Sequence, residues 1–187
     1  MNLLDLILIA FSITSGMFAL SLVANVQKCL TIFEKIRLTA LFTFIPASLL
    51  WIGYWAGIII LAFMKWTNEW VFFTLEIIIG IRMIIRSLKT DPENVTYRYG
   101  DFKVVFVLAI ALGLPAFIIG IGFAFTKIEI NLFLIPMIVF GLILSISGMI
   151  IGKRTGNYLL GNKAIFLGGI MFVGLALKNG IELLGFI

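Results

Sequence analysis

Only one carboxylate lies well inside an apolar stretch of this chain, and its side chain is the one best placed to bind an ion. Glu76 falls within residues 70–85, and Arg82 follows six residues later, on a different face of a helix. An ionisable residue in such surroundings is a candidate for lining a transport pathway. Arg82 and Lys178 could instead extend their charged ends outward, and Lys178 could meet Glu182 one helical turn later or approach Glu76.

Hydroxyl side chains form a second set of candidate ligands. Their oxygens could line a path for a small solute or a partly hydrated ion, or they could bond their own backbone or a neighbouring helix. Five of them fall in two apolar stretches: Ser12, Thr14, Ser15, Ser145 and Ser147. Methionine sulfur could bind a soft cation such as Cu(I), but in a chain that is 62% hydrophobic we interpret the methionines as packing residues.

The composition leaves little room for catalysis. The chain has no histidine, which excludes imidazole as a general base near neutral pH and as a metal ligand. Its one cysteine, Cys29, cannot form an internal disulfide, and the sequence has no Cys-x-x-Cys pair, phosphate-binding loop or nucleophile–base pair. We therefore expect no enzymatic activity and no cofactor.

Long uncharged runs indicate the architecture. Four runs of at least 22 residues contain no Asp, Glu, Lys or Arg: residues 6–27, 38–64, 104–126 and 130–152. A helix of that length spans the roughly 30 Å hydrocarbon layer of a membrane. Two further apolar stretches, residues 70–85 and 164–186, carry the four charged residues described above. Because the mean hydropathy of +1.19 argues against a soluble helical core, the sequence predicts an all-α integral membrane protein with six transmembrane helices.

Lysine and arginine are distributed unevenly among the loops. The first, third and fifth loops hold ten of them: Lys28, Lys35, Arg37, Arg86, Lys89, Arg98, Lys103, Lys153, Arg154 and Lys163. The second and fourth loops hold one each, Lys65 and Lys127. The positive-inside rule therefore places loops one, three and five in the cytoplasm and both termini outside. The same distribution accounts for the net charge of +5 without a nucleic-acid partner.

Glycines that recur at nearly constant spacing indicate an internal repeat. Gly53 pairs with Gly148 and Gly57 with Gly152 at 95 residues, and Gly80 pairs with Gly174 at 94. Glycines four residues apart in a membrane helix usually let two backbones approach closely. The shared spacing predicts that one half of the chain repeats the other.

Three helices per half is an odd number, so the two halves must insert in opposite orientations. The sequence thus predicts one membrane domain, residues 1–187, built from inverted repeats 1–87 and 103–187 with a cytoplasmic loop, residues 88–102, between them. Such an architecture places a solute site near the membrane midplane, between the halves.

Helix-weakening residues occur at matched positions of the first and fourth predicted helices. Gly16 and Pro115 are 99 residues apart. Such residues at matched depths point to a binding site, although Gly16 could equally provide close packing and Pro115 a kink. A hydrated cavity lined by Ser15 and Ser147 where these helices meet would favour transport, and a dry, packed centre would favour a scaffold.

Several segments resemble the manganese efflux pump family (MntP and YtaF type) of the lysine-exporter superfamily. They are Gly80–Ile84, Ser145–Gly152 and Lys163–Gly169, together with Glu34–Arg37 and Trp70. The resemblance covers nearly the whole chain. It implies a six-helix exporter of the bacterial plasma membrane, in which Gly168 and Gly169 are further helix-packing residues.

The chain departs from this family where a metal would bind. The family has carboxylates in the first, second, fourth and sixth helices, and this chain has Gly16, Pro46, Pro115 and Ile165 there. Manganese is a hard dication that prefers about six oxygen ligands, with carboxylates compensating most of its charge. We therefore predict an exporter with an altered cargo, a small ion or a less highly charged solute.

Two alternatives stay open. The chain could still export Mn²⁺, using Glu76, hydroxyl oxygens and backbone carbonyls freed near Gly16 and Pro115. It could also be a degenerate member that no longer transports and serves as a membrane scaffold or partner subunit. For a transporter we expect the lipid bilayer and a small ion or solute as partners, no nucleic acid, and a homodimer as an option.

Overall fold

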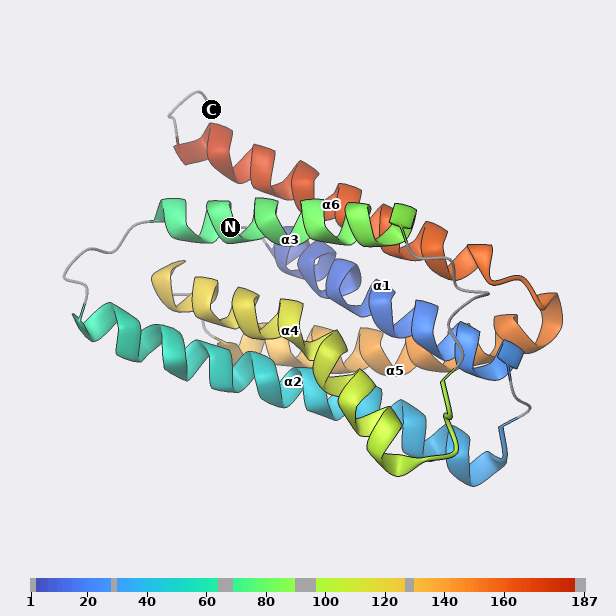
Figure 1. Cartoon of the computed structure of the whole chain (residues 1–187). Helices are drawn as coiled ribbons and strands as arrows, with labels where there is room; N and C mark the ends of the chain where they lie inside the picture. The colour runs from blue at the N-terminus through green and yellow to red at the C-terminus, as the bar shows by residue number, and fades with distance from the viewer. Residues whose placement is uncertain (1–2, 28–29, 64–68, 90–96, 127–129, 184–187) are drawn as a thin grey trace.

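The computed structural model describes residues 3–27, 30–63, 69–89, 97–126 and 130–183. Within these ranges the chain forms six α-helices and no strand (Figure 1): α1 Leu3–Gln27, α2 Ile32–Phe63, α3 Glu69–Lys89, α4 Phe102–Thr126, α5 Ile130–Thr155 and α6 Leu159–Leu183. The predicted all-α architecture is confirmed. Cys29 and three loop lysines, Lys28, Lys65 and Lys127, lie outside the described ranges.

Five of the six helices are long and apolar enough to cross a membrane: α1, α2, α4, α5 and α6. The remaining helix, α3, has 21 residues and is more polar, because it carries Glu76, Arg82, Arg86 and Lys89. In Figure 1 it runs beside α6 along the bundle.

The longest helix, α2, begins before the uncharged run does. Its 32 residues measure about 48 Å at 1.5 Å per residue, more than the roughly 30 Å hydrocarbon layer. A capping box precedes it, in which Thr31 N donates to Glu34 Oε2 at 2.9 Å and Glu34 N donates to Thr31 Oγ1 at 3.3 Å. The first turns of α2 therefore extend beyond the apolar layer and carry charges.

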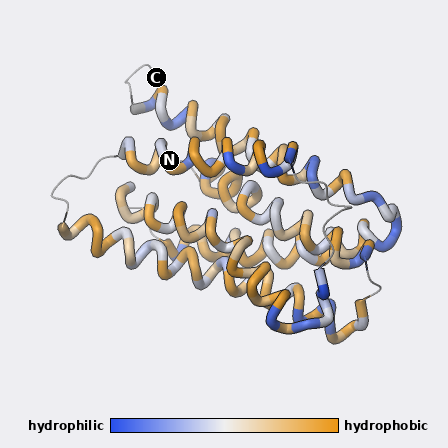
Figure 2. Tube along the Cα trace, in the orientation of Figure 1, coloured by the Kyte–Doolittle hydropathy of each residue, from blue (hydrophilic) through white to orange (hydrophobic). Residues whose placement is uncertain are grey.

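The helices pack in three principal pairs. α2 lies against α4, α1 against α5, and α3 against α6, and α1 also contacts α6. The amino ends of α1, α3 and α5 gather at one end of the bundle, together with the last turn of α6 (Figure 1); we call this the termini end. The opposite, basic end holds a large group of hydrophilic segments in Figure 2 and carries these cations: Lys35, Arg37, Arg86, Lys89, Lys103, Lys153, Arg154 and Lys163.

Glycines bring α2 and α4 into backbone contact. A methyl group added at Gly53 would collide with the carbonyl oxygen of Phe117. One added at Gly57 would lie 2.7 Å from the carbonyl oxygen of Ile121. Both distances are shorter than a carbon–oxygen contact allows, so a side chain at either position would push the helices apart.

The same arrangement occurs between α1 and α5. A methyl group added at Gly148 would lie 2.5 Å from the carbonyl oxygen of Phe18, and one added at Gly152 would lie 2.5 Å from that of Leu22. The two glycine pairs noticed in the sequence therefore occupy equivalent environments in two different helix pairs.

Replacing Gly148 with alanine should destabilise the protein by roughly 1–3 kcal/mol, the usual cost of overpacking. Thermal unfolding of the detergent-purified protein measures the effect. Gly174→Ala is the matched control, because a methyl group there meets no atom within 4 Å and alanine favours the helix over glycine. An unchanged melting temperature for Gly148→Ala would contradict the close approach of α1 and α5.

The third helix pair is asymmetric. A methyl group added at Gly80 would lie 2.8 Å from Val173 Cγ2, and one added at Gly169 would lie 3.0 Å from the Gly80 carbonyl oxygen. Gly168 lies against the hydroxyl of Ser15 on α1. Gly174, the sequence partner of Gly80, makes no comparable approach to another helix.

Candidate functional site

The interior of α3 holds a carboxylate that faces α6. The Glu76 side chain is 0% exposed, and its Oε2 accepts a hydrogen bond from Asn179 Nδ2 at 2.9 Å. Glu76 Oε1 and Asn179 Oδ1 are also buried, and neither has a hydrogen-bond partner in the described parts of the chain. A buried polar atom without a partner costs about 1–3 kcal/mol, so this pair of oxygens favours a bound positive group.

Both oxygens are hydrogen-bond acceptors, and they can be satisfied in two ways. A proton on Glu76 Oε1 would let the acid donate to Asn179 Oδ1, which closes a second hydrogen bond between the two side chains. A small cation could instead bind at these oxygens. Both groups are positive, so the unpartnered acceptors favour a cation or a proton over an anion.

A second carboxylate lies next to this pair. Lys178, which precedes Asn179, donates to Asp5 Oδ1 at 2.6 Å. The Asp5 side chain is 1% exposed, whereas that of Lys178 is 40% exposed. Lys178 also lies 3.7 Å from Glu182, the partner expected from the sequence. We call Asp5, Glu76, Lys178 and Asn179 the polar cluster, in which α1, α3 and α6 converge.

Neither Asp5 nor Asn179 is among the residues predicted from the sequence. Lys178 was a candidate to approach Glu76 from α6, but the neighbouring Asn179 makes that contact instead. Asn179 could have been noticed as an amide inside an apolar stretch, whereas nothing about Asp5, near the start of its helix, indicates burial. The described residues contain no group of three or more His, Cys, Asp or Glu side chains that could hold a metal ion.

Two of the five predicted hydroxyls line a half-open cavity of about 320 Å³. Ser15 of α1 and Ser147 of α5 both line it, with Ala164 and Leu167 of α6 as the third wall. We expected α4 in that place, but α4 touches α1 only slightly. Ser15 Oγ donates to the Ser12 carbonyl at 2.7 Å, and Ser147 Oγ donates to the Leu144 carbonyl at 3.1 Å. Since their protons are used, these hydroxyls offer lone pairs to the cavity, whose other lining residues are apolar.

The remaining hydroxyl candidates make structural bonds. Thr14 Oγ1 donates to the Ala10 carbonyl of its own helix at 2.8 Å. Ser145 Oγ bonds Ser21 Oγ across the α1–α5 contact at 2.9 Å. Nearer the basic end of the same contact, Asn25 Nδ2 donates to the Met149 carbonyl at 2.6 Å.

Comparison with known proteins gives the chain its relatives. A family model described as "Putative manganese efflux pump" matches residues 29–179. The chain belongs to the manganese efflux pump family. Proteins named as MntP pumps of this family are similar to it: one from Methanobrevibacter smithii is 34% identical over 181 residues, covering 95% of this chain and 96% of that protein. One from Enterobacter sp. (strain 638) is 32% identical over 183 residues, covering 94% of each, and one from Serratia proteamaculans is 30% identical over 190 residues, covering 100% of each. No solved structure matches.

Membership of this family, together with the apolar helices, makes the chain a multi-pass protein of the bacterial plasma membrane.

The resemblance implies four carboxylates that this chain lacks. Three of these four positions lie around one point of the bundle. A methyl group added at Gly16 would lie 3.2 Å from Leu112 Cδ2, and one added at Gly113 would lie 3.1 Å from Pro46 Cα. Leu112 and Gly113 are within one helical turn of Pro115 on α4. The stretches of α1, α2 and α4 that meet there contain no charged residue.

The side chains near the point where Gly16, Pro46 and Pro115 meet are only weakly polar. A methyl group added at Gly141 would lie 3.3 Å from Met17 Sδ and 3.4 Å from Thr43 Oγ1, and Thr43 Oγ1 is buried with no partner in the described structure. Ile165, the fourth position, is buried, and Arg82 is exposed on the outside of α3. Among the side chains that the structure describes, the buried carboxylates thus lie in the polar cluster, away from the point where Gly16, Pro46 and Pro115 meet.

Proposed function

We propose that the chain exports a small cation and that the polar cluster, rather than the positions of the replaced carboxylates, holds the cargo. The unpartnered pair of Glu76 Oε1 and Asn179 Oδ1 carries this proposal. A scaffold gains nothing from a fully buried carboxylate with an unsatisfied oxygen, because such a group costs stability unless something binds it. In a transport site the cost is expected, because the oxygens that bind the ligand are unpartnered whenever the ligand has left.

The charges of the cluster favour a cargo of low charge. Asp5 is compensated by Lys178, which leaves Glu76 as the carboxylate available to a cation. One carboxylate and one amide oxygen supply little of the coordination that a hard dication needs. A monovalent cation or a proton fits this ligand set better than Mn²⁺.

The packing supports the inverted repeat of residues 1–87 and 103–187 around the loop 88–102. Gly53 and Gly148 differ by 95, and the residues whose carbonyls they approach, Phe117 and Phe18, differ by 99 (117 minus 18). Exchanging α1 with α4 and α2 with α5 therefore converts one contact into the other. The same spacing of 99 residues separates Gly16 from Pro115, the matched helix-weakening residues of α1 and α4.

The direction of insertion follows from the charges. The basic end faces the cytoplasm by the positive-inside rule, and the termini end faces outward. α3 is the sixth span, because its 21 residues measure about 32 Å. Glu76 is seven residues from the start of α3, about 10 Å from the outer end. The cluster thus lies on the side where an exporter releases its cargo.

The second candidate function is Mn²⁺ export, which the names of the relatives favour. Expression in a manganese-sensitive strain that lacks its own exporter decides between the two. We expect no rescue of growth in manganese, because the carboxylates needed for a dication are replaced, while membrane insertion is confirmed by blotting. Rescue that depends on Glu76 would establish the second function and refute the altered cargo.

Purified protein in liposomes provides the direct test. We expect the movement of H⁺, Na⁺ or K⁺, followed with ion-sensitive dyes, to exceed that of Mn²⁺ by at least about tenfold. Protein-free liposomes give the background. Liposomes that pass none of these cations would leave only the scaffold interpretation.

A further inference from the structure

A groove opens between α2 and α5 at the basic end. Its volume is about 430 Å³, and it is lined by the first turns of α2 and the last turns of α5, with Asn25 of α1 beside them. No residue of the polar cluster lines it, so the groove is separate from the proposed cargo site.

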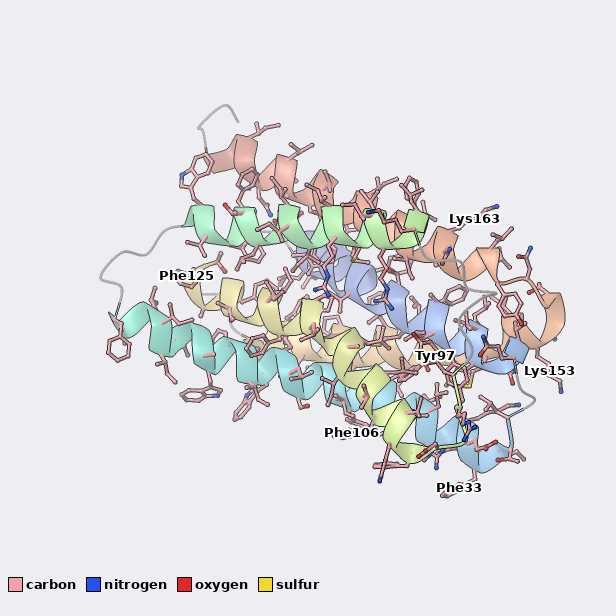
Figure 3. The ribbon with its side chains drawn as sticks, in the orientation of Figure 1. Phe33, Tyr97, Phe106, Phe125, Lys153 and Lys163 are labelled. Carbon is pink, nitrogen blue, oxygen red and sulfur yellow. The ribbon has the colours of Figure 1, made fainter. Side chains whose placement is uncertain are left out.

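The mouth of the groove is positively charged. Lys35 of α2 and Lys153 and Arg154 of α5 line it, and no Asp or Glu does so among the described residues. Glu34, the neighbour of Lys35, accepts hydrogen bonds from Thr31 at the start of its own helix. Figure 3 shows Lys153 extending from the last turn of α5 at this end of the bundle.

Away from the mouth the groove becomes apolar. Phe44 of α2 and Leu142, Ile146 and Ile150 of α5 line this part. Phe44 is nine residues from Lys35, about 14 Å along the helix. That length is about half of the roughly 30 Å hydrocarbon layer, so the groove runs from a charged membrane surface through the depth of one leaflet.

We propose that this groove binds an anionic phospholipid of the cytoplasmic leaflet, with the phosphate at Lys35, Lys153 and Arg154 and an acyl chain along the apolar part. Basic pockets between transmembrane helices on the cytoplasmic side are known to hold anionic headgroups. A free anion would leave the apolar part uncovered. A zwitterionic lipid has no net charge to match three cations, and an apolar helix of a second copy would bring no anion to them.

The opposite ends of the same two helices lack these charges. At the spacing of 95 residues that relates α2 to α5 in the proposed inverted repeat, the three cations correspond to Ile130, Ile58 and Ile59. Because the two halves share the same helix packing, packing does not explain why the cations occur at only one of the two ends. They are confined to one membrane surface, as a site for a lipid of one leaflet requires.

Lipid binding to the purified full-length protein in detergent tests the proposal by native mass spectrometry, with phosphatidylglycerol, phosphatidylcholine and inorganic phosphate as probes. We expect phosphatidylglycerol to bind at least tenfold more tightly than phosphatidylcholine. Replacing all three cations, Lys35→Gln, Lys153→Gln and Arg154→Gln, should weaken it by roughly 100-fold, about fivefold for each charge.

The matched control removes three cations outside the groove: Lys89→Gln, Lys103→Gln and Lys163→Gln, all exposed. Lys163 lies on α6, well away from Lys153 (Figure 3). This variant loses the same charge and should keep its preference for phosphatidylglycerol. Ile146→Trp fills the apolar part without changing any charge and should lose the lipid, which keeps the test valid if the triple groove variant does not fold.

Four outcomes would overturn the proposal. The two lipids could bind equally, both triple variants could weaken binding equally, or inorganic phosphate could bind as tightly as the lipid. The fourth is a dimer that Ile146→Trp dissociates without changing the bound lipid, which would make the groove a protein interface. None of these measurements depends on transport, so they are independent of the proposed cargo.

Discussion

Replacing Glu76 with glutamine should abolish cation transport and leave the protein at least as stable as the parent. Glutamine keeps the shape of the side chain and removes its charge. Its amide can donate to Asn179 Oδ1 while its oxygen accepts from Asn179 Nδ2, so Asn179 Oδ1 gains a partner and a donor replaces the unpartnered carboxylate oxygen. We expect a stability gain of about 1 kcal/mol from the added hydrogen bond.

The loss of transport follows from the loss of the charged ligand. A contact with a charged group contributes about 1.5–3 kcal/mol, so the affinity for the cation should fall by roughly 10- to 100-fold. Ion flux into liposomes and the melting temperature are measured on the same preparations. A variant that transports at the parental rate would remove Glu76 from the pathway, and one that melts earlier would show that its carboxylate is structural.

Glu182→Gln is the control for this experiment. It removes a carboxylate from α6 near the same end of the bundle, and its side chain is exposed and 3.7 Å from Lys178. An exposed ion pair of this kind contributes little. Transport by Glu182→Gln should stay within about twofold of the parent, since the ion pair of Glu182 is with Lys178 and not with the Glu76–Asn179 pair.

The helices could be predicted from the sequence because charges mark where the chain meets water. The uncharged run from residue 6 to 27 is nearly all of α1. The run from residue 38 to 64 gives the end of α2 but not its start, which lies six residues earlier at Ile32. A charge-free run shows which part of a helix lies in the apolar layer, whereas the ends of the helix are determined by capping groups such as Thr31 and Glu34.

The partners of the buried side chains could not be predicted in the same way. Glu76 was identified because a carboxylate in an apolar stretch is conspicuous. That Asn179 rather than Lys178 reaches it depends on the rotation of α6 about its axis, and adjacent residues differ by 100° in direction. Asp5 was missed for the same reason, because its ion pair with Lys178 depends on how α6 packs against α1.

The hydroxyl candidates show the limit of arguing from residue type. Ser15 and Ser147 line one half-open cavity, but α6 forms its third wall where we expected α4. The prediction paired α1 with α4 by their place in the predicted repeat, whereas α1 packs mainly against α5 and α4 mainly against α2. Of the three pairs of corresponding helices, α3 and α6 pack closely together, and α1 and α4 touch only slightly.

The Asp5–Lys178 pair should respond asymmetrically to loss of either partner. Lys178→Met leaves the Asp5 carboxylate, 1% exposed, without its cation. Breaking a fully buried pair is strongly destabilising, and because Lys178 is 40% exposed we expect a smaller loss, seen as a clearly lower melting temperature. Asp5→Asn leaves a lysine that can reach water or Glu182 at 3.7 Å, so its melting temperature should stay close to that of the parent.

Thermal unfolding of the two single variants and of the double variant Asp5→Asn with Lys178→Met measures this difference. The double variant removes both charges, so it should recover most of the stability lost in Lys178→Met. Equal losses in the two single variants, with no recovery in the double variant, would mean that the side chains act independently. In that case Asp5 would keep its own charge available to a cation, and the argument for a cargo of low charge would lose its basis.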